Sequence, residues 1–298
     1  MCTAVYLNEG YFGRTLDYER SFGEEVLHSP RGSFCYGQAK NRYAALGVGV
    51  CDGDCPMYFD GINEFGLCGA ALNFSGYASY GKGSDGLKSG KVVSFILGFC
   101  RDRNEAVSAI KSLGIVGGEG DAPLHWIIAD AGGAITVEMV ANGLKIYENR
   151  VGILTNSPEF SYHLTRLSDF SAMSPISPNN LVNLGISQHT RGQGAYGLPG
   201  DFSSSSRFAR ASYLRENSIA GEGGEMNRLR HILSAISLPL GTVRADDGSA
   251  VCSLYTSLCN MESLTYEVTT YTDPRPISYT LSPDLTEGGE VKAYPLYE

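Results

Sequence analysis

Residues 1–20 read MCTAVYLNEGYFGRTLDYER, and this stretch places a cysteine directly behind the first methionine. The segments TAVYL and YFGRTLD flank Asn-Glu-Gly, a pattern that predicts two strands joined by a turn. Chain ends usually fray, so position 2 is an unusual place for a purely structural cysteine. The segment therefore raises the question of whether Cys2 is an ordinary strand residue or a nucleophile.

Pairing across the predicted hairpin brings a carboxylate close to the backbone nitrogen of Cys2. A three-residue turn places Cys2 opposite Leu16, whereas a two-residue turn places it opposite Asp17 itself. Directly opposed residues of antiparallel strands lie about 5 Å apart. In either register, Asp17 therefore lies within one residue of the position opposite Cys2, and its carboxylate lies near the Cys2 nitrogen. Arg14 precedes Asp17 by three positions, and a regular strand points two such residues to opposite faces. Either an irregularity near residues 15–16 brings them together, or they act on Cys2 from different sides.

Removal of Met1 would give Cys2 a free α-amino group beside its own thiol. An α-amine titrates near about 7.7–8.0, so its neutral form can act as a general base for that thiol. A nearby carboxylate would orient the amine, and a nearby guanidinium would lower the thiol pKa. Taken alone, the hairpin favours the simpler interpretation, a strand cysteine beside an Arg14–Asp17 surface ion pair worth at most about 1 kcal/mol.

The composition is that of an ordinary globular protein without a nucleic-acid or membrane signature. The chain has 298 residues, of which 43% are hydrophobic and 18% are charged, and it is long enough to bury a sizeable core. The net charge is -9 and the 23 Lys and Arg residues form no basic run, which argues against nucleic acid as a partner. Neither a long apolar stretch nor a secretory leader is present, so we expect no membrane contact and a cytoplasmic location.

The cysteine pattern predicts neither disulfides nor a metal site. A chain of this length without a leader is expected to keep its eight cysteines reduced, most of them as small buried hydrophobic residues. CDGDC at 51–55 lacks a second ligand pair at the spacing that zinc requires, and the five histidines are scattered. We therefore expect no metal and no other cofactor.

Strand patterns dominate both ends of the chain, and most helical patterns lie between them. Helices are predicted over residues 92–100, 103–114, 160–170, 206–218 and 225–237. Strand patterns include residues 24–30, 43–50, 124–130, 134–140, 252–260 and 264–272. No linker or repeat divides the chain, so the sequence predicts one α+β domain over residues 1–298, with sheets completed by both termini and covered by helices.

Further motifs follow the opening hairpin in a fixed order. They are YFDGINEFGLCGAALNFSGYASY (58–80), LHWIIAD (124–130), GILTNSP (152–158), GQGAYGLPGDFSSSSRFARASYL (192–214) and YTSLCN (255–260). With MCTA and YFGRTLDYE, this set resembles the choloylglycine hydrolase family, which contains bile salt hydrolases and penicillin V acylases. The resemblance covers nearly the whole chain. It implies the N-terminal-nucleophile hydrolase fold, a four-layer αββα sandwich.

The resemblance also implies roles for individual residues. Cys2 becomes the nucleophile, Arg14 the cation near its thiol, and Asp17 the carboxylate that orients its amine. The remaining catalytic positions that it implies are Asn73, Asn156 and Arg207. In the family the thiolate attacks an amide carbonyl, and Asn73 with a backbone N–H near Asn73 or Asn156 would hold the oxyanion. Taken singly, the two asparagines fit turn residues at strand ends, and Arg207 fits an exposed helix residue.

The Asn of the LNF motif favours the bile-salt side of the family over the penicillin V acylases, which often carry Tyr there. The implied reaction is hydrolysis of a glycine- or taurine-conjugated bile acid through an acyl-thioester. A pocket for a steroid should be largely apolar, and the candidate lining residues are Leu16, Phe59, Ile115 and Val116. The alternatives are an acylase of the same fold acting on penicillin V or an acyl homoserine lactone, and a non-catalytic thiol-rich binding protein.

Residues 173–200 form a long loop-rich segment between two predicted helices. Relatives in the family use the matching extension to form tetramers. The resemblance therefore implies a homotetramer with this segment as the oligomerisation extension.

Overall fold

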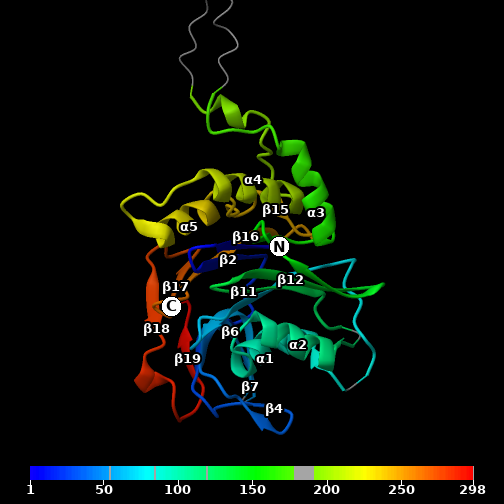
Figure 1. The fold of residues 1–298 in the computed structure, drawn as a ribbon, viewed down its shortest axis with the longest axis vertical. Coiled ribbons are helices and arrows are strands. Elements are labelled where there is room, and N and C mark those ends of the chain that lie inside the picture. The colour runs from blue at the N-terminus through cyan, green and yellow to red at the C-terminus, as the bar shows by residue number, and fades with distance from the viewer. Residues whose placement is uncertain (54, 84, 119, 178–190, 298) are drawn as a thin grey trace, which may run out of the picture.

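Two large sheets lie face to face between two layers of helices (Figure 1). The structure is a computed structural model that describes all residues except 54, 84, 119, 178–190 and 298. Through the molecule the layers run from α4 and α5, through a seven-stranded and an eight-stranded sheet, to α1 and α2. This arrangement confirms the predicted αββα sandwich.

The seven-stranded sheet contains the opening hairpin at its centre. Its order is β14-β1-β2-β16-β17-β18, and β15 pairs with β16. The strands are β1 (Cys2–Leu7), β2 (Tyr11–Tyr18), β14 (Ile153–Leu154), β15 (Val243–Arg244), β16 (Ala250–Asn260), β17 (Thr265–Thr270) and β18 (Ile277–Thr280). In the hairpin Leu7 pairs with Tyr11 and Cys2 pairs with Leu16, which is the register of the three-residue turn.

The eight-stranded sheet has the order β13-β12-β11-β8-β7-β6-β3-β19. The strands are β3 (Glu25–Ser29), β6 (Ala45–Asp52), β7 (Cys55–Asn63), β8 (Cys68–Asn73), β11 (Leu124–Asp130), β12 (Gly133–Val140), β13 (Gly143–Glu148) and β19 (Lys292–Pro295). Because β19 pairs with β3, the C-terminal part of the chain completes this sheet while the N-terminal part lies in the other. Two short ladders, β4 (Cys35–Tyr36) with β5 (Ala39–Lys40) and β9 (Leu87–Lys88) with β10 (Ile115–Val116), lie outside both sheets.

The helices cover the outer faces of the sheets. Helices α1 (Val92–Phe99) and α2 (Arg103–Leu113) pack on the eight-stranded sheet, and α4 (Ser204–Asn217) and α5 (Gly224–Ser234) pack on the seven-stranded sheet. Helix α3 (Phe160–Leu167) packs against α4. Helix α2 begins after Asp102, whose carboxylate caps two backbone amides, and it ends at Gly114, whose φ of 70° suits glycine.

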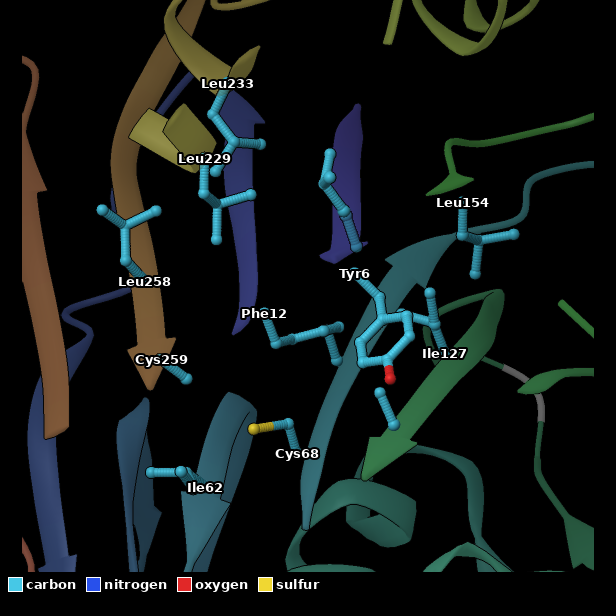
Figure 2. Close-up of a cluster of buried hydrophobic side chains, with 14 of the residues drawn as sticks. Tyr6, Phe12, Ile62, Cys68, Ile127, Leu154, Leu229, Leu233, Leu258 and Cys259 are labelled. Atoms are coloured by element: carbon cyan, nitrogen blue, oxygen red, sulfur yellow. The ribbon is translucent and has the colours of Figure 1, made fainter. Parts of the chain in front are cut away.

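An apolar core fills the space between the sheets and continues through the seven-stranded sheet to α5 (Figure 2). Phe12, Ile62 and Cys68 belong to its inter-sheet part, and Leu233 belongs to α5. Gly13 faces the helix, where a Cβ atom would come within 2.9 Å of the Leu233 side chain. The glycine therefore allows α5 to pack closely on the strand that carries Arg14 and Asp17.

The described parts of residues 173–200 are joined to each other by backbone contacts. The Ser174 N–H donates to the Gly194 carbonyl at 3.0 Å, and the Gln193 N–H donates to Ser177 Oγ at 3.1 Å. Residues 178–190 lie outside the described part of the chain, so the predicted oligomerisation extension stays a prediction. No helix among the described residues is both long enough and apolar enough to cross a membrane.

Candidate active site

Cys2 begins β1, and its thiol points into the space between the two sheets. The residue is only 3% exposed, and the Arg14 Nη2 group donates a hydrogen bond to Cys2 Sγ at 2.9 Å. Arg14 comes from the paired strand β2 and is completely buried. Burial works to lower the pKa of Arg14, but Tyr255, Cys2 and Asp60 around it raise that pKa above its ordinary value. A permanent cation therefore lies in contact with the sulfur.

Asp60 of β7 holds Arg14 in place, and sequence reasoning missed this residue. Arg14 Nη1 donates to Asp60 Oδ2 at 3.3 Å and to Tyr255 Oη at 3.1 Å. The buried carboxylate also accepts hydrogen bonds from Tyr255 at 2.5 Å, Ser257 at 2.7 Å and Tyr266 at 2.6 Å. Because burial raises the pKa of both tyrosines well above the ordinary value, their hydroxyls stay protonated as donors. The only sequence signal was one acidic residue inside an otherwise mostly apolar strand.

Asp17 lies on the other face of β2, toward α4. Its Oδ1 accepts a hydrogen bond from Ser253 Oγ at 2.6 Å, whereas its buried Oδ2 has no hydrogen-bond partner among the described residues. Arg207 Nη1 lies 3.8 Å from that Oδ2 atom. The hairpin is regular through this region, and the irregularity lies in β16, between Ser253 and Tyr255. Arg14 and Asp17 thus approach Cys2 from different sides.

Asn156 and Arg207 surround the backbone of Cys2. The Cys2 N–H donates to Asn156 Oδ1 at 2.8 Å, and Arg207 Nη2 donates to the same oxygen at 2.7 Å. Arg207 Nη1 donates to the Cys2 carbonyl at 2.6 Å and to Thr3 Oγ1. Arg207 is completely buried, so it is not the exposed helix residue of the alternative interpretation. Its burial lowers its pKa, although Asp17 and Cys2 act to raise it.

Asn73 ends β8 and reaches both the loop of Asn156 and the cavity beside Cys2. Its carbonyl accepts a hydrogen bond from Asn156 Nδ2 at 2.9 Å. Its Oδ1 accepts from the N–H of Ser75 at 3.1 Å and from Ser75 Oγ at 2.8 Å, as in an Asx turn. The Nδ2 group of the same side chain has no hydrogen-bond partner among the described residues. Asn73 is therefore both a turn residue and part of the predicted catalytic set.

An apolar cavity of about 330 Å³ opens at the Cys2 thiol. Leu16 and Phe59, both predicted pocket residues, lie in its wall. The other lining residues are Met1, Cys2, Arg14, Tyr18, Phe22, Val50, Met57, Tyr58, Ala71, Asn73, Gly90, Ala122 and Leu124. The cavity therefore joins the candidate nucleophile to a wall made largely of apolar side chains.

Ile115 and Val116 do not line this cavity, so their predicted placement was wrong. Ile115 is 2% exposed and belongs to the core between the eight-stranded sheet and its helices. Val116 lines a separate surface cavity together with Tyr80 and Lys88. The physical reason is the short β9–β10 ladder, in which Ile115 pairs with Leu87 and is drawn into the core.

Met1 precedes β1 and forms two backbone hydrogen bonds with Asp17 of β2. The Asp17 N–H donates to the Met1 carbonyl at 2.9 Å, and the Met1 amino group donates to the Asp17 carbonyl.

Among the described residues, no group of three or more His, Cys, Asp or Glu side chains is placed to hold a metal ion.

Solved structures show the same fold. A mutant of the conjugated bile acid hydrolase from Clostridium perfringens is 29% identical with a TM-score of 0.91, covering 99% of this chain and 96% of that one. The penicillin V acylase from Agrobacterium tumefaciens, 21% identical, has a TM-score of 0.79 with 99% and 91% covered. The latter likeness concerns the fold alone. The protein thus has the N-terminal-nucleophile hydrolase fold.

Sequence relatives identify the family within that fold class. The profile of the linear amide C–N hydrolases, choloylglycine hydrolase family, matches residues 2–291. A bile salt hydrolase/transferase from Lactiplantibacillus plantarum is 35% identical, with 99% of this chain and 97% of the relative covered. One from Clostridium perfringens is 31% identical, with 99% and 96% covered. The chain belongs to the choloylglycine hydrolase family of linear amide C–N hydrolases.

Proposed function

We propose that this protein hydrolyses the amide bond of glycine- or taurine-conjugated bile acids, with Cys2 as the nucleophile after Met1 has been removed. The observation that carries the proposal is the position of Cys2. Its thiol contacts Arg14 at the end of an apolar cavity, while its nitrogen contacts Asn156 close to Asp17. The names of the relatives support the substrate class.

Removal of Met1 turns the Cys2 amide nitrogen into an amine. Asn156 Oδ1 already accepts one hydrogen bond from this nitrogen at 2.8 Å. The buried Asp17 Oδ2, which has no hydrogen-bond partner among the described residues, supplies an acceptor for a further amine proton. The neutral amine then takes the thiol proton, and Arg14 stabilises the thiolate from the opposite face.

The thiolate attacks the amide carbonyl carbon and forms a tetrahedral oxyanion. We assign Asn73 Nδ2 as an oxyanion donor, because the Asn156 backbone N–H is already bonded to Ser204 Oγ at 2.9 Å. The C–N bond breaks as the Cys2 ammonium protonates the leaving nitrogen, which releases glycine or taurine. The amine then deprotonates a water molecule that attacks the thioester, and the free bile acid leaves with the thiol restored.

The cavity suits a flat apolar acyl group whose reacting end lies near Cys2. Leu16, Phe59 and Phe22 contribute apolar wall, and the polar groups gather at the Cys2 and Asn73 end. Ligand pockets in proteins are commonly apolar with a few polar groups that fix orientation. This distribution supports a steroid acyl chain held by its apolar body.

Rates on glycocholate, taurocholate and penicillin V, measured side by side with one enzyme preparation, test the substrate assignment. We expect kcat/KM for at least one bile-acid conjugate to exceed that for penicillin V by an order of magnitude or more. Faster hydrolysis of penicillin V by orders of magnitude would favour the acylase alternative. No turnover of any of the three by folded protein would favour the non-catalytic binding protein.

We further propose a single domain that forms a homotetramer in the cytoplasm. Strands from both ends of the chain lie in the two stacked sheets, which supports one domain. Ile176 and Tyr196, in the described part of the extension, are 76% and 91% exposed apolar residues. Such side chains gain from burial between subunits. A molar mass of four chains by light scattering is expected, and a monomer would contradict the tetramer.

A further inference from the structure

The backbone of Asn156 is held by side chains. Strand β14 ends at Leu154, two residues earlier, so its ladder does not reach Asn156. The Asn156 N–H donates to Ser204 Oγ at 2.9 Å, and the Asn156 carbonyl accepts a hydrogen bond from His163 Nε2 at 2.9 Å. The carbonyl of the preceding residue, Thr155, lies 3.0 Å from His125 Nε2. The loop that carries Asn156 is therefore fixed by α3, α4 and β11.

His163 is built to donate one hydrogen bond to Asn156. It is 1% exposed, and its ring stacks on Phe208 with a centroid distance of 5.0 Å and an interplanar angle of 16°. Burial lowers the pKa of His163, which favours the neutral ring. A carbonyl oxygen can only accept, so the neutral ring must carry its proton on Nε2. Its Nδ1 atom has no hydrogen-bond partner among the described residues.

Ser204 completes the support from the first turn of α4. Its Oγ accepts from the Asn156 N–H and lies 3.0 Å from Thr155 Oγ1 and 3.3 Å from His163 Nε2. The two side chains therefore meet behind Asn156 and fix both polar groups of its peptide backbone. Neither His163 nor Ser204 lies in the wall of the cavity at Cys2.

We infer that His163 and Ser204 are positioning residues, which hold Asn156 so that its Oδ1 meets the nitrogen of Cys2. The inference rests on the proposed role of Cys2 and goes beyond it. The Asn156 side chain contacts Cys2 at 2.8 Å and the Asn73 carbonyl at 2.9 Å, so a shift of its backbone disturbs both contacts. Misplacement of a catalytic group by about 1 Å can cost about 100-fold in rate. Loss of either anchor should therefore lower kcat with little change in KM.

The matched pair His163→Met and His163→Gln tests whether the N–H that His163 donates to the Asn156 carbonyl is required. Met and Gln have similar length, but only Gln offers an N–H at the position of Nε2. We expect His163→Met to lower kcat for a bile-acid conjugate by about tenfold or more, with KM within about twofold. We expect His163→Gln to recover most of that loss. A merely structural role would not distinguish these two variants in kcat at equal folded fraction.

A second set of variants independently tests Ser204 Oγ, the acceptor of the Asn156 N–H. Ser204→Ala removes the oxygen that binds the Asn156 N–H, whereas Ser204→Thr retains a hydroxyl at this position. Ser205→Ala is the control, because Ser205 follows in α4 and is not a partner of Asn156. We expect kcat to fall for Ser204→Ala by about fivefold or more, to recover in Ser204→Thr and to stay unchanged in Ser205→Ala.

The wild-type enzyme separates failure of this inference from failure of the proposed function. Without wild-type hydrolysis of conjugates the proposed function fails first. With an active wild type, a normal kcat in folded His163→Met, or no recovery in His163→Gln, overturns the role of His163. If His163→Met does not fold, the Ser204 set decides, and a normal kcat in Ser204→Ala then overturns the inference.

Discussion

Arg14 and Asp17 are three residues apart on one strand and reach Cys2 from opposite faces of the sheet. Arg14 touches the thiol at 2.9 Å, whereas Asp17 lies on the α4 side beside Ser253 and Arg207. The strand geometry therefore separates two tasks. In the proposed mechanism, one face stabilises negative charge on the sulfur, and the other face receives the amine that forms when Met1 is removed.

Replacement of Cys2 by Ser should leave the fold intact and abolish most of the activity. The hydroxyl is a far weaker nucleophile than a thiolate at neutral pH, so we expect kcat to fall on the order of 10³-fold or more. Cys35→Ser is the matched control, because Cys35 is exposed. Circular dichroism checks the fold, and an active Cys2→Ser enzyme would remove Cys2 as the nucleophile.

Asp17→Asn should lower kcat more than it raises KM. The substitution removes the carboxylate that we assign to the Cys2 amine and leaves the cavity wall unchanged. A loss of about 10-fold to 100-fold in kcat is expected, since removal of a charged hydrogen bond costs about 1.5–3 kcal/mol. Steady-state kinetics at saturating conjugate measure the effect. An unchanged kcat would take Asp17 out of the mechanism.

Tyr255→Phe and Tyr266→Phe distinguish a contribution to the stability of the fold from a contribution to the position of Arg14. Both hydroxyls donate to Asp60, but only Tyr255 also contacts Arg14. Each loss leaves a buried acceptor short of a donor, so urea unfolding should show about 1–3 kcal/mol of destabilisation in both. We expect kcat/KM to fall several-fold only in Tyr255→Phe. Equal kinetics in the two variants would contradict a role of Tyr255 in holding Arg14.

Phe59→Ala should lower kcat/KM for bile-acid conjugates, whereas Val116→Ala should leave it unchanged. Phe59 lies in the cavity wall at Cys2, and Val116 lines a different cavity. Loss of an aromatic wall removes about 1.5–3 kcal/mol of apolar contact, which predicts a fall in kcat/KM of about 10-fold or more. A larger loss in Val116→Ala would contradict the assignment of the cavity.

Local strand and helix signals predicted one α+β domain with its sheets completed by both ends of the chain, whereas the four-layer αββα arrangement was predicted from the family resemblance. Pairing limited the hairpin to two registers, but it left open whether an irregularity near residues 15–16 brings Arg14 and Asp17 together or whether they act on Cys2 from different sides. The roles of Asn73, Asn156 and Arg207 came from the family resemblance, since contacts between residues far apart in the sequence leave no local pattern. Arg207 contacts Asn156, 51 positions away, and Cys2, 205 positions away.

The missed and misplaced residues share one physical cause. Asp60 joins two sheets through Arg14 and Tyr255, and no spacing within its own strand reveals those partners. Ile115 lies in a strand of only two residues whose pairing with Leu87 turns it into the core. A pair of strands this short leaves no detectable alternation. Packing between distant segments decided both positions.

Mass spectrometry of the N-terminal peptide shows whether Cys2 is the N-terminal residue and whether it carries the acyl group. The enzyme is incubated with glycocholate, quenched in acid within the first turnover and digested. We expect the peptide to begin at Cys2, without Met1, and a fraction of it to carry one cholyl group in a thioester that hydroxylamine releases. An active enzyme that retains Met1, or a cholyl group bound to any other residue, would rule out Cys2 as the N-terminal nucleophile.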